Sequence, residues 1–402
     1  MTLRAVPPEP ELSPAETSAL ARVTGDPFGF LSETWSQRAA VFPDADGGGF
    51  ADLLSLEDVD RLLTTTSPRT PTFRLVKAGA QIPESTYTRS GRTGSKPVSG
   101  MADPARIFAL FDDGATIVLQ GVHRYHEPVA RFCRALELEL GHPCQANAYI
   151  TPAGAQGLAL HADPHDVFVL QAFGRKQWEV HGAPAESERD PLEATVDPGD
   201  AIYMPKGTPH AASAQATASG HLTIGVHVTT WREVLEGAWR EVEEDPAFDE
   251  PVAAGWHRDL DAFSDEFRDR LAAASSALAS VDTDAQADRR ERRFLSSRAQ
   301  LMHGALRAQL GLDAIDDTTL LRRRDGAVCE IRPRGDRLEI LLGDRALEMP
   351  GWIESALRHI AASGRFRPRD LAPEIGDPAS RLVLTRRLVR EGLLVPDDLG
   401  VR

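Results

Sequence analysis

Between about Gln145 and Trp231, the apolar residues of this chain fall in short runs rich in β-branched and aromatic side chains. Glycine, proline and aspartate separate the runs, which read ANAYITP, DVFVLQAFG, QWEVHG, AIYMP and HLTIGVHVTTW. Runs of this length between turn residues are typical of short strands, and several in succession build a barrel or sandwich. The segment is therefore predicted to be an all-β barrel or sandwich.

Segments with helical patterns precede this β-rich part. Short amphipathic helices are expected from Pro27 to about Thr72, and Glu127–Leu140 carries its apolar residues on one face. Residues 1–26 are rich in Pro, Ala and Glu and are expected to be a loosely tied extension. The polar segment Arg89–Asp103 contains three glycines and is predicted to be a mobile loop, either a lid near a substrate or an ordinary surface loop.

After Trp231 the pattern becomes helical. Apolar stripes run over 234–242 and 263–278, and a third helix is expected to begin at the basic run Arg289–Arg293 and to continue through Leu306. Such stripes need a partner to bury them. This helical region is therefore predicted to form a dimerisation unit or, alternatively, to pack on the barrel of its own chain.

The last part of the chain, from about Gly311, reads as a separate unit. Short strands are expected within 327–349, and helices over Trp352–Ala362 and Ser380–Glu391, followed by a Gly-Leu-Leu step. This order resembles a winged-helix domain. The second helix carries four arginines, which permits a DNA-binding interpretation, but such a run of charges is more typical of a solvated face.

The composition is that of an ordinary globular protein of two or three domains, with 42% hydrophobic and 26% charged residues among 402. Three scattered cysteines without a CxxC pair argue against disulfides and structural zinc, and fit a cytoplasmic location. Neither a signal peptide nor a membrane span is expected. The net charge of −15 disfavours nucleic acid and suits a basic partner.

One histidine and one aspartate have the spacing of metal ligands. His161 and Asp163 are separated by one residue, so on extended chain both side chains point to the same face. The candidate third ligand is His210, at the end of the run PGDAIYMPKGTPH, which reads as strand, tight turn, strand. Two imidazoles and one carboxylate that leave positions open form the facial triad of non-heme Fe(II) oxygenases.

Other interpretations of these residues remain open at this point. An isolated HxD pair is common by chance, and both residues can instead cap a turn. His165 is a rival ligand, but Pro164 interrupts the strand, so His165 is expected beside the metal or the substrate. His221 and His227 are further rivals, and a packed or hydrogen-bonded barrel histidine is the plainer interpretation of both. The order HxD, PGD, PxGxxH within a β-rich region favours the metal site.

A buried cation would indicate the co-substrate. Lys176 lies past the strand Val167–Ala172 and the turn at Gly174, and is expected to return on the adjacent strand. Inside the barrel its ammonium can pair with the distal carboxylate of 2-oxoglutarate, since a buried lysine without an anion is costly. The alternative is that Arg175 and Lys176 form a solvated pair at the end of a hairpin.

Two residues on the preceding strand are further candidates. Asn147 and Tyr149 are two positions apart and face one side of that strand. Both can hydrogen-bond the bound acid or a substrate, and Tyr149 can alternatively belong to the core.

Together these runs closely resemble the JmjC-type cupin proteins called ribosomal oxygenases. The resemblance covers most of the chain and rests on NAYITPAGAQG from Asn147, HAD from His161, DVFVLQAFGRKQW from Asp166, PGD from Pro198 and PKGTPH from Pro205. It implies an α+β protein with N-terminal helices and a double-stranded β-helix (jelly-roll or cupin) JmjC barrel. The implied domains are an extension over 1–26, the barrel over 27–232, a helical dimerisation domain over 233–310 and a winged helix over 311–402.

The resemblance also implies roles for individual residues. His161, Asp163 and His210 would bind iron. Lys176 would hold the distal carboxylate of 2-oxoglutarate, with help from Thr223 on the last barrel strand, and Asn147 would line the pocket.

The function implied by the resemblance is that of a dimeric 2-oxoglutarate-dependent dioxygenase. It would use O2 to hydroxylate a histidine or arginine side chain of a ribosomal protein. The alternatives are hydroxylation of a modified-peptide precursor or a small molecule, demethylation of methyl-lysine, and a non-catalytic cupin or winged-helix regulator.

Overall fold

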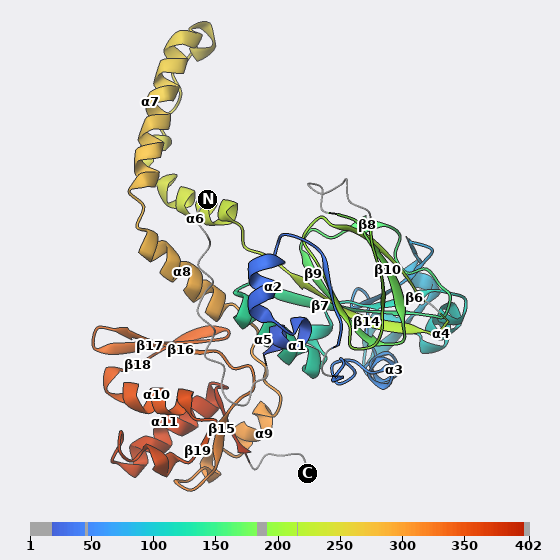
Figure 1. The fold of residues 1–402 in the computed structure, drawn as a ribbon. Helices are drawn as coiled ribbons and strands as arrows, with labels where there is room; N and C mark the ends of the chain where they lie inside the picture. Colours follow the sequence, from blue (N-terminus) through green and yellow to red (C-terminus); the bar gives the residue numbers. More distant parts are fainter. Residues whose placement is uncertain (1–17, 45–46, 183–190, 215, 398–402) are drawn as a thin grey trace. The chain divides into compact units, whose positions relative to one another are not determined.

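The computed structural model describes residues 18–44, 47–182, 191–214 and 216–397 (Figure 1). By its internal contacts the chain divides into two units. Unit 1 comprises Met1–Val228, Leu301–Ala327 and Ile353–Arg402, and unit 2 comprises Thr229–Gln300 and Val328–Trp352. Within the described ranges, no helix combines the length and the apolar character that crossing a membrane requires.

Two antiparallel sheets of unit 1 form the barrel and confirm the predicted β-rich segment. The eight-stranded sheet has the order β1-β12-β9-β14-β7-β6-β2-β3, and the four-stranded sheet the order β11-β10-β13-β8. The larger sheet contains β1 (Ala40–Phe42), β2 (Phe73–Lys77), β3 (Ala80–Gln81), β6 (Thr116–Leu119), β7 (Cys144–Thr151), β9 (Asp166–Phe173), β12 (Ala201–Met204) and β14 (Ser219–Val226). The smaller sheet contains β8 (His161–Ala162), β10 (Lys176–Val180), β11 (Leu192–Val196) and β13 (Pro209–Ala214).

Both faces of the larger sheet are buried, and they differ in what covers them. Successive side chains of a strand point to opposite faces. On β9, Phe168 and Leu170 belong to the core that includes the N-terminal helices. Val167 and Val169 belong instead to a second core with Trp178 of β10, between the two sheets. The face of the larger sheet that carries Val167 and Val169 therefore lines the inside of the barrel.

The helices before the barrel are packed against it. They are α1 (Ala19–Thr24), α2 (Pro27–Glu33), α3 (Leu56–Thr64), α4 (Pro104–Asp112) and α5 (Glu127–Leu140), the last with the predicted bounds. The expectation of a loosely tied extension is wrong for α1. Leu20 is buried, and the carboxylate of Glu139 accepts hydrogen bonds from Ser18 Oγ (2.6 Å) and from the amide of Ala19 (2.7 Å). Residues 1–17 lie outside the described part.

The segment Arg89–Asp103 is a β-hairpin, so the prediction of a loop is wrong. Strands β4 (Thr88–Thr93) and β5 (Lys96–Ala102) pair with each other and form a separate two-stranded sheet. Gly94 turns the chain between them with a positive φ of 60°. The glycines that indicated a loop therefore serve the turn and a bulged strand pair.

Unit 2 combines three helices with a three-stranded sheet. The helices are α6 (Trp231–Val242), α7 (Leu260–Ala279) and α8 (Thr283–Ser296), and the sheet consists of β16 (Cys329–Arg334), β17 (Arg337–Leu342) and β18 (Arg345–Pro350). Ion pairs join α8 to the sheet, including Arg292 to Glu339 (2.7 Å) and Arg332 to Asp288 (2.9 Å).

The third helix differs from its prediction. It begins at Thr283, because the carboxylate of Asp282 accepts hydrogen bonds from the free amides of its first turn, and it ends at Ser296. The basic run therefore lies inside this helix, and a separate helix α9 (Ala305–Leu310) follows it.

The C-terminal part of unit 1 contains two longer helices and a small sheet. The helices are α10 (Glu354–Ala362) and α11 (Pro378–Arg390). Strand β15 (Leu321–Arg323) pairs with both β19 (Arg365–Phe366) and β20 (Leu394–Pro396). The strands β16, β17 and β18, which lie within the stretch assigned to the winged helix from the sequence, group with α6, α7 and α8 instead.

Candidate metal and co-substrate site

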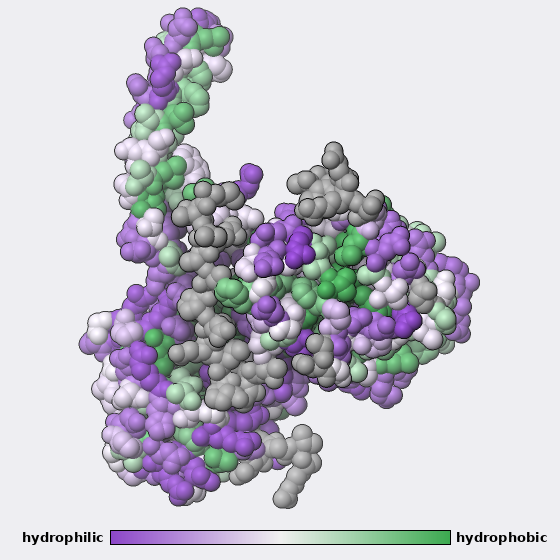
Figure 2. All heavy atoms as spheres, viewed as in Figure 1, coloured by the Kyte–Doolittle hydropathy of each residue, from purple (hydrophilic) through white to green (hydrophobic). Residues whose placement is uncertain are grey.

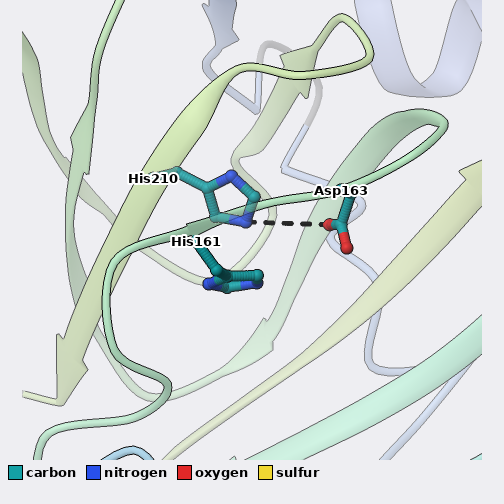
Figure 3. Close-up of side chains that lie close together, drawn as sticks. All are labelled: His161, Asp163 and His210. Atoms are coloured by element: carbon teal, nitrogen blue, oxygen red, sulfur yellow. Dashed lines mark ion pairs between the residues drawn. The ribbon is translucent and has the colours of Figure 1, made fainter.

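The three predicted metal ligands meet inside the barrel. Strands β8 and β13 pair so that His161 lies directly opposite His210, and the two ring centroids are 4.4 Å apart. Asp163 follows the end of β8, and its Oδ2 lies 3.7 Å from Nε2 of His210 (Figure 3). One candidate ligand atom from each residue lies within 4.8 Å of the others. Atoms bound at about 2.1 Å to one ion lie about 3 to 4 Å apart, so the arrangement fits a metal after small adjustments.

Backbone carbonyls orient both imidazoles. Nδ1 of His161 lies 2.8 Å from the carbonyl oxygen of Ala159, and Nδ1 of His210 lies 2.9 Å from that of Thr208. A carbonyl can only accept, so each Nδ1 carries the proton and each Nε2 keeps its lone pair. Burial lowers the pKa of His210, which keeps this ring neutral at pH 7. Both histidines are thus set to bind a metal through Nε2.

A pocket of about 430 Å³, partly open to solvent, extends from the triad between the two sheets. The larger sheet contributes polar side chains to it, and the smaller sheet contributes Lys176 and Trp178. The lining residues are Thr116, Tyr149, Gly157, Leu158, His161, Asp163, Val167, Val169, Lys176, Trp178, His210, Ala212, His221 and Thr223. The triad and the candidate co-substrate residue Lys176 therefore share one pocket.

Lys176 lies on the smaller sheet, opposite β9, and not on the strand adjacent to it as predicted. The chain crosses between the sheets at Gly174, where φ is +64° and an added Cβ would lie 2.0 Å from the carbonyl oxygen of Ala218. Only glycine fits there. The alternative of a solvated pair is wrong, because Arg175 is exposed and bound to Asp197 while Lys176 is only 2% exposed.

The ammonium of Lys176 is buried and is held by neutral side chains. Its Nζ donates to Oγ1 of Thr151 (3.1 Å) and lies 3.5 Å from Nδ1 of His221. Among the described residues no carboxylate pairs with it, and burial lowers the pKa of Lys176 to about 7. A buried cation in this state favours an anionic ligand.

A second donor in the pocket lacks an acceptor. Within the described chain, Nε1 of Trp178 is buried and has no hydrogen-bond partner. A buried donor left unpaired costs about 1 to 3 kcal/mol. Lys176 and Trp178 are two positions apart on β10 and both side chains are buried. An anion with acceptor oxygens in this pocket fits both groups.

The remaining predicted residues differ in what they contact. Tyr149 lines the pocket and stacks on His221. Oδ1 of Asn147 accepts from the amide of Gly121 (2.9 Å), so that oxygen holds a backbone turn. Thr223 lines the pocket, whereas the threonine bound to Lys176 is Thr151.

The sequence reasoning therefore missed Thr151, and it named His221 without foreseeing its contact with Lys176. Thr151 continues the two-residue alternation of Asn147 and Tyr149 along β7, so the period of the strand could have identified it. His221 lies directly opposite Tyr149 in the pairing of β14 with β7. Its contact with Lys176 depends on the packing of two sheets.

The rival histidines make their contacts with side chains other than the triad. Nε2 of His165 is 3.2 Å from Nε2 of Gln145, and its ring contacts the ring of His227 at 5.1 Å between centroids. His221 is packed inside the barrel, as the plainer interpretation predicted, but beside Lys176.

Residues 121–234 match the family model described as the JmjC domain. Over these residues the chain is similar to the JmjC domain. The match covers β7 to β14 and all three residues of the triad. The predicted resemblance is therefore confirmed at the level of this domain.

Curated relatives of the JmjC domain include ribosomal oxygenases. The chain is 29% identical to Ribosomal oxygenase 1 of Gallus gallus over 228 residues, covering 52% of this chain and 36% of that protein. It is 30% identical to the bifunctional lysine-specific demethylase and histidyl-hydroxylase NO66 of Branchiostoma floridae over 213 residues, covering 52% and 32%. The chain thus spans about a third of the length of these relatives.

A solved structure resembles most of this chain in fold. The crystal structure of the Escherichia coli ribosomal oxygenase YcfD superposes with a TM-score of 0.51 at 19% identity, covering 92% of this chain and 97% of that one. YcfD was also solved in complex with cobalt and 2-oxoglutarate, with the same TM-score and coverage. At this identity the likeness shows the fold alone, and it confirms the predicted cupin-type JmjC fold.

Proposed function

We propose that this protein is an Fe(II)- and 2-oxoglutarate-dependent oxygenase that hydroxylates a histidine or arginine side chain of a protein, with ribosomal proteins as the substrate class. One observation carries the proposal. A His-Asp-His triad lines the same pocket as a buried lysine that pairs with no carboxylate among the described residues. The names of the relatives and the complex of YcfD with cobalt and 2-oxoglutarate agree with it.

The residues present fit both iron and 2-oxoglutarate. His161, Asp163 and His210 would hold Fe(II) through three ligands and leave three positions open, two for a chelating 2-oxo acid and one for O2. When bound, the ferrous ion with 2-oxoglutarate supplies the oxidation that places one oxygen atom of O2 on a C–H bond and yields succinate and CO2. Lys176 would bind the distal carboxylate.

The chain's own side chains would perform the other tasks of the reaction. Lys176 and the indole N–H of Trp178 would orient the acid by hydrogen bonds. Val167 and Val169 form an apolar wall of the pocket and would exclude water from it. Tyr149 and Thr223 would border the acid or the substrate, and Asn147 would support the pocket through Gly121. The intact triad and Lys176 argue against a non-catalytic cupin.

The substrate class has weaker but independent support. The net charge of −15 suits a basic protein segment, as ribosomal proteins commonly offer. One relative's name combines demethylation of lysine with hydroxylation of histidine, and both reactions use the same iron chemistry. The triad and Lys176 would serve equally in the hydroxylation of a modified-peptide precursor or a small molecule.

The proposal is tested by comparing ribosomal proteins from cells with and without this gene, using intact-mass analysis. We expect one protein to carry the mass of one added oxygen atom only when the gene is present. The purified chain with Fe(II) and O2 should form succinate from 2-oxoglutarate, and faster with that protein. Loss of methyl mass instead would show demethylation. No succinate under any condition would refute the oxygenase.

We also propose that α6 and α7 mediate homodimerisation, within a helical region over 233–310. Figure 2 shows hydrophobic side chains along the helix that Figure 1 labels α7. Five apolar residues of these two helices are more than half exposed: Trp231 (70%), Leu235 (62%), Leu260 (60%), Phe267 (59%) and Leu271 (56%). A second copy of the chain would bury this surface. Apolar residues gathered on one surface indicate an interface, whereas single scattered ones are normal.

The replacement of both Phe267 and Leu271 by aspartate is expected to convert the dimer to a monomer. Four carboxylates per dimer would lie in a surface that must exclude water. Light scattering after gel filtration should give twice the chain mass of 43.7 kDa for the wild type and one chain mass for the variant. Val383→Asp is the matched control, because Val383 is 70% exposed on α11 of unit 1. A monomeric wild type would contradict the proposal.

We propose that the stretch 311–402 predicted as a winged helix serves protein contacts through its residues in unit 1, 311–327 and 353–402. Three of the four arginines on α11 have partners within the chain. Arg381 is buried and pairs with Asp317 (2.6 Å), Arg386 donates to the carbonyl of Ile315, and Arg387 pairs with Glu391. These contacts occupy charges that DNA binding would need.

The three cysteines are free thiols, which agrees with the proposed cytoplasmic location.

A further inference from the structure

His221 occupies a closed position inside the barrel. It is only 3% exposed. Its ring stacks on Tyr149, with centroids 5.1 Å apart and planes within 7°, and meets the edge of Trp178 at 5.3 Å and 77°. Two aromatic rings at different angles leave the imidazole little freedom to rotate. The direction of each ring nitrogen is therefore set by packing.

The contact with Lys176 determines which nitrogen carries the proton. Nδ1 of His221 lies 3.5 Å from Nζ of Lys176. When Lys176 is charged, its ammonium has three N–H donors and no lone pair, so the imidazole accepts and Nδ1 is unprotonated. Burial, then the charge of Lys176, keeps the pKa of His221 well below its ordinary value. The ring is thus neutral, with its proton on Nε2.

Thr151 completes the surroundings of the ammonium. Its Oγ1 accepts from Nζ at 3.1 Å and is itself 3.1 Å from Oγ1 of Thr116. Two acceptors on two strands, β7 and β14, therefore hold two of the three N–H groups of Lys176. Lysine has a long flexible side chain, and fixing it before a ligand arrives lowers the entropy lost on binding.

We infer that His221 is a positioning residue that, with Thr151, directs the third N–H of Lys176 to the far carboxylate of a 2-oxo dicarboxylate. The inference rests on the proposed function, and it assigns to His221 the preference for such acids over 2-oxo acids without a far carboxylate. A histidine that only filled space would have no influence on this preference, because an aromatic ring of similar size would replace it.

His221→Phe is expected to remove the preference. Phenylalanine keeps a ring between Tyr149 and Trp178 but offers no acceptor. The affinity for 2-oxoglutarate should fall about tenfold or more, the usual effect of losing one hydrogen bond to a charged group. The affinity for pyruvate, which has no far carboxylate, should change less than about twofold. His221→Asn, whose Oδ1 takes the place of Nδ1, should restore most of the preference.

The experiment is a titration of the full chain, loaded with Co(II) and kept free of O2, with 2-oxoglutarate and with pyruvate. The visible absorption of cobalt reports chelation without requiring turnover. Ser219→Ala is the matched control, because Ser219 lies on the same strand but bonds to Gln171 (2.9 Å). It should leave the ratio of the two affinities unchanged.

The outcomes separate the inference from the function. A wild type that binds the two acids equally well, or binds neither, would refute 2-oxoglutarate as co-substrate. The inference on His221 would be overturned by two results, both with a wild type that prefers 2-oxoglutarate. In the first, the His221→Phe variant keeps the same preference, and in the second its affinity for both acids falls by the same factor. If the His221→Phe variant does not fold, two other variants decide the question. His221→Asn must keep the preference for 2-oxoglutarate over pyruvate, and His221→Gln, whose oxygen reaches beyond the position of Nδ1, must lose it.

Discussion

The replacement of His210 by alanine is expected to weaken metal binding by at least about 100-fold and to abolish the turnover of 2-oxoglutarate. His210 supplies one of three candidate ligands, and a neighbouring carbonyl orients its ring so that Nε2 faces Asp163. With two ligands left, the site cannot hold the metal in one geometry. Iron retained after dialysis and succinate formed with O2 are the two measurements.

His165→Ala is the matched control for the metal ligands. His165 lies two residues after Asp163, but its ring contacts Gln145 and His227. Its replacement should leave the iron content within about twofold of the wild type, since no ligand is removed. If His210→Ala retained iron and turnover while His165→Ala lost them, the ligand assignment would be wrong.

The replacement of Lys176 by methionine is expected to weaken 2-oxoglutarate binding by about 100-fold or more, because a buried carboxylate loses its charged partner. The wild type should bind the acid with an affinity that depends on pH. Without ligand the pKa of Lys176 is about 7, and a bound carboxylate raises it. Above pH 7 binding must take up a proton, so the dissociation constant should rise about tenfold per pH unit.

The measurement is a titration with 2-oxoglutarate from pH 7 to pH 9. The methionine variant should show a weak and flat profile over this range. Lys206→Met, which removes an exposed charge, should behave like the wild type. A wild-type profile that stayed flat above pH 7 would mean that Lys176 does not hold the acid.

The same substitution should stabilise the protein without its co-substrate. Burial lowers the pKa of Lys176 from 10.5 to about 7. Between these values the unfolded chain binds more protons, so the free energy of unfolding rises with pH, and below pH 7 the penalty is complete. That penalty is about 5 kcal/mol at most. Methionine removes this penalty. The increase in the free energy of unfolding, measured by urea denaturation, should therefore be largest below pH 7 and vanish toward pH 10.5.

Much of the barrel could be predicted because its strands are short and end at turn residues. The five runs noted between Gln145 and Trp231 correspond to β7, β9, β10, β12 and β14. His161 and Asp163 were identifiable because a spacing of two positions on extended chain is a local property. His210 required the order of motifs, and the pairing of β8 with β13 shows why that order brings it opposite His161.

Other features depended on contacts between distant segments. Glycines in Arg89–Asp103 indicated a loop, yet strand pairing makes a hairpin of it. Polar residues around Ser18 indicated a loose end, yet hydrogen bonds to Glu139 and a buried Leu20 hold α1 on α5. The local composition of a segment indicates which conformations it can adopt. The contacts that stabilise one of them come from residues elsewhere in the chain.

The sequence by itself determined the β-rich barrel and the pair His161 and Asp163, because these follow from alternation and spacing along extended chain. The order of the motifs, and the family resemblance that they carry, added His210 and Lys176 as candidates. Only the tertiary structure decided that Lys176 crosses to the opposite sheet, and that Thr151 and His221 hold its ammonium. The physical reason is that two sheets packed face to face bring together side chains from strands that do not pair. No pattern along one strand carries that information.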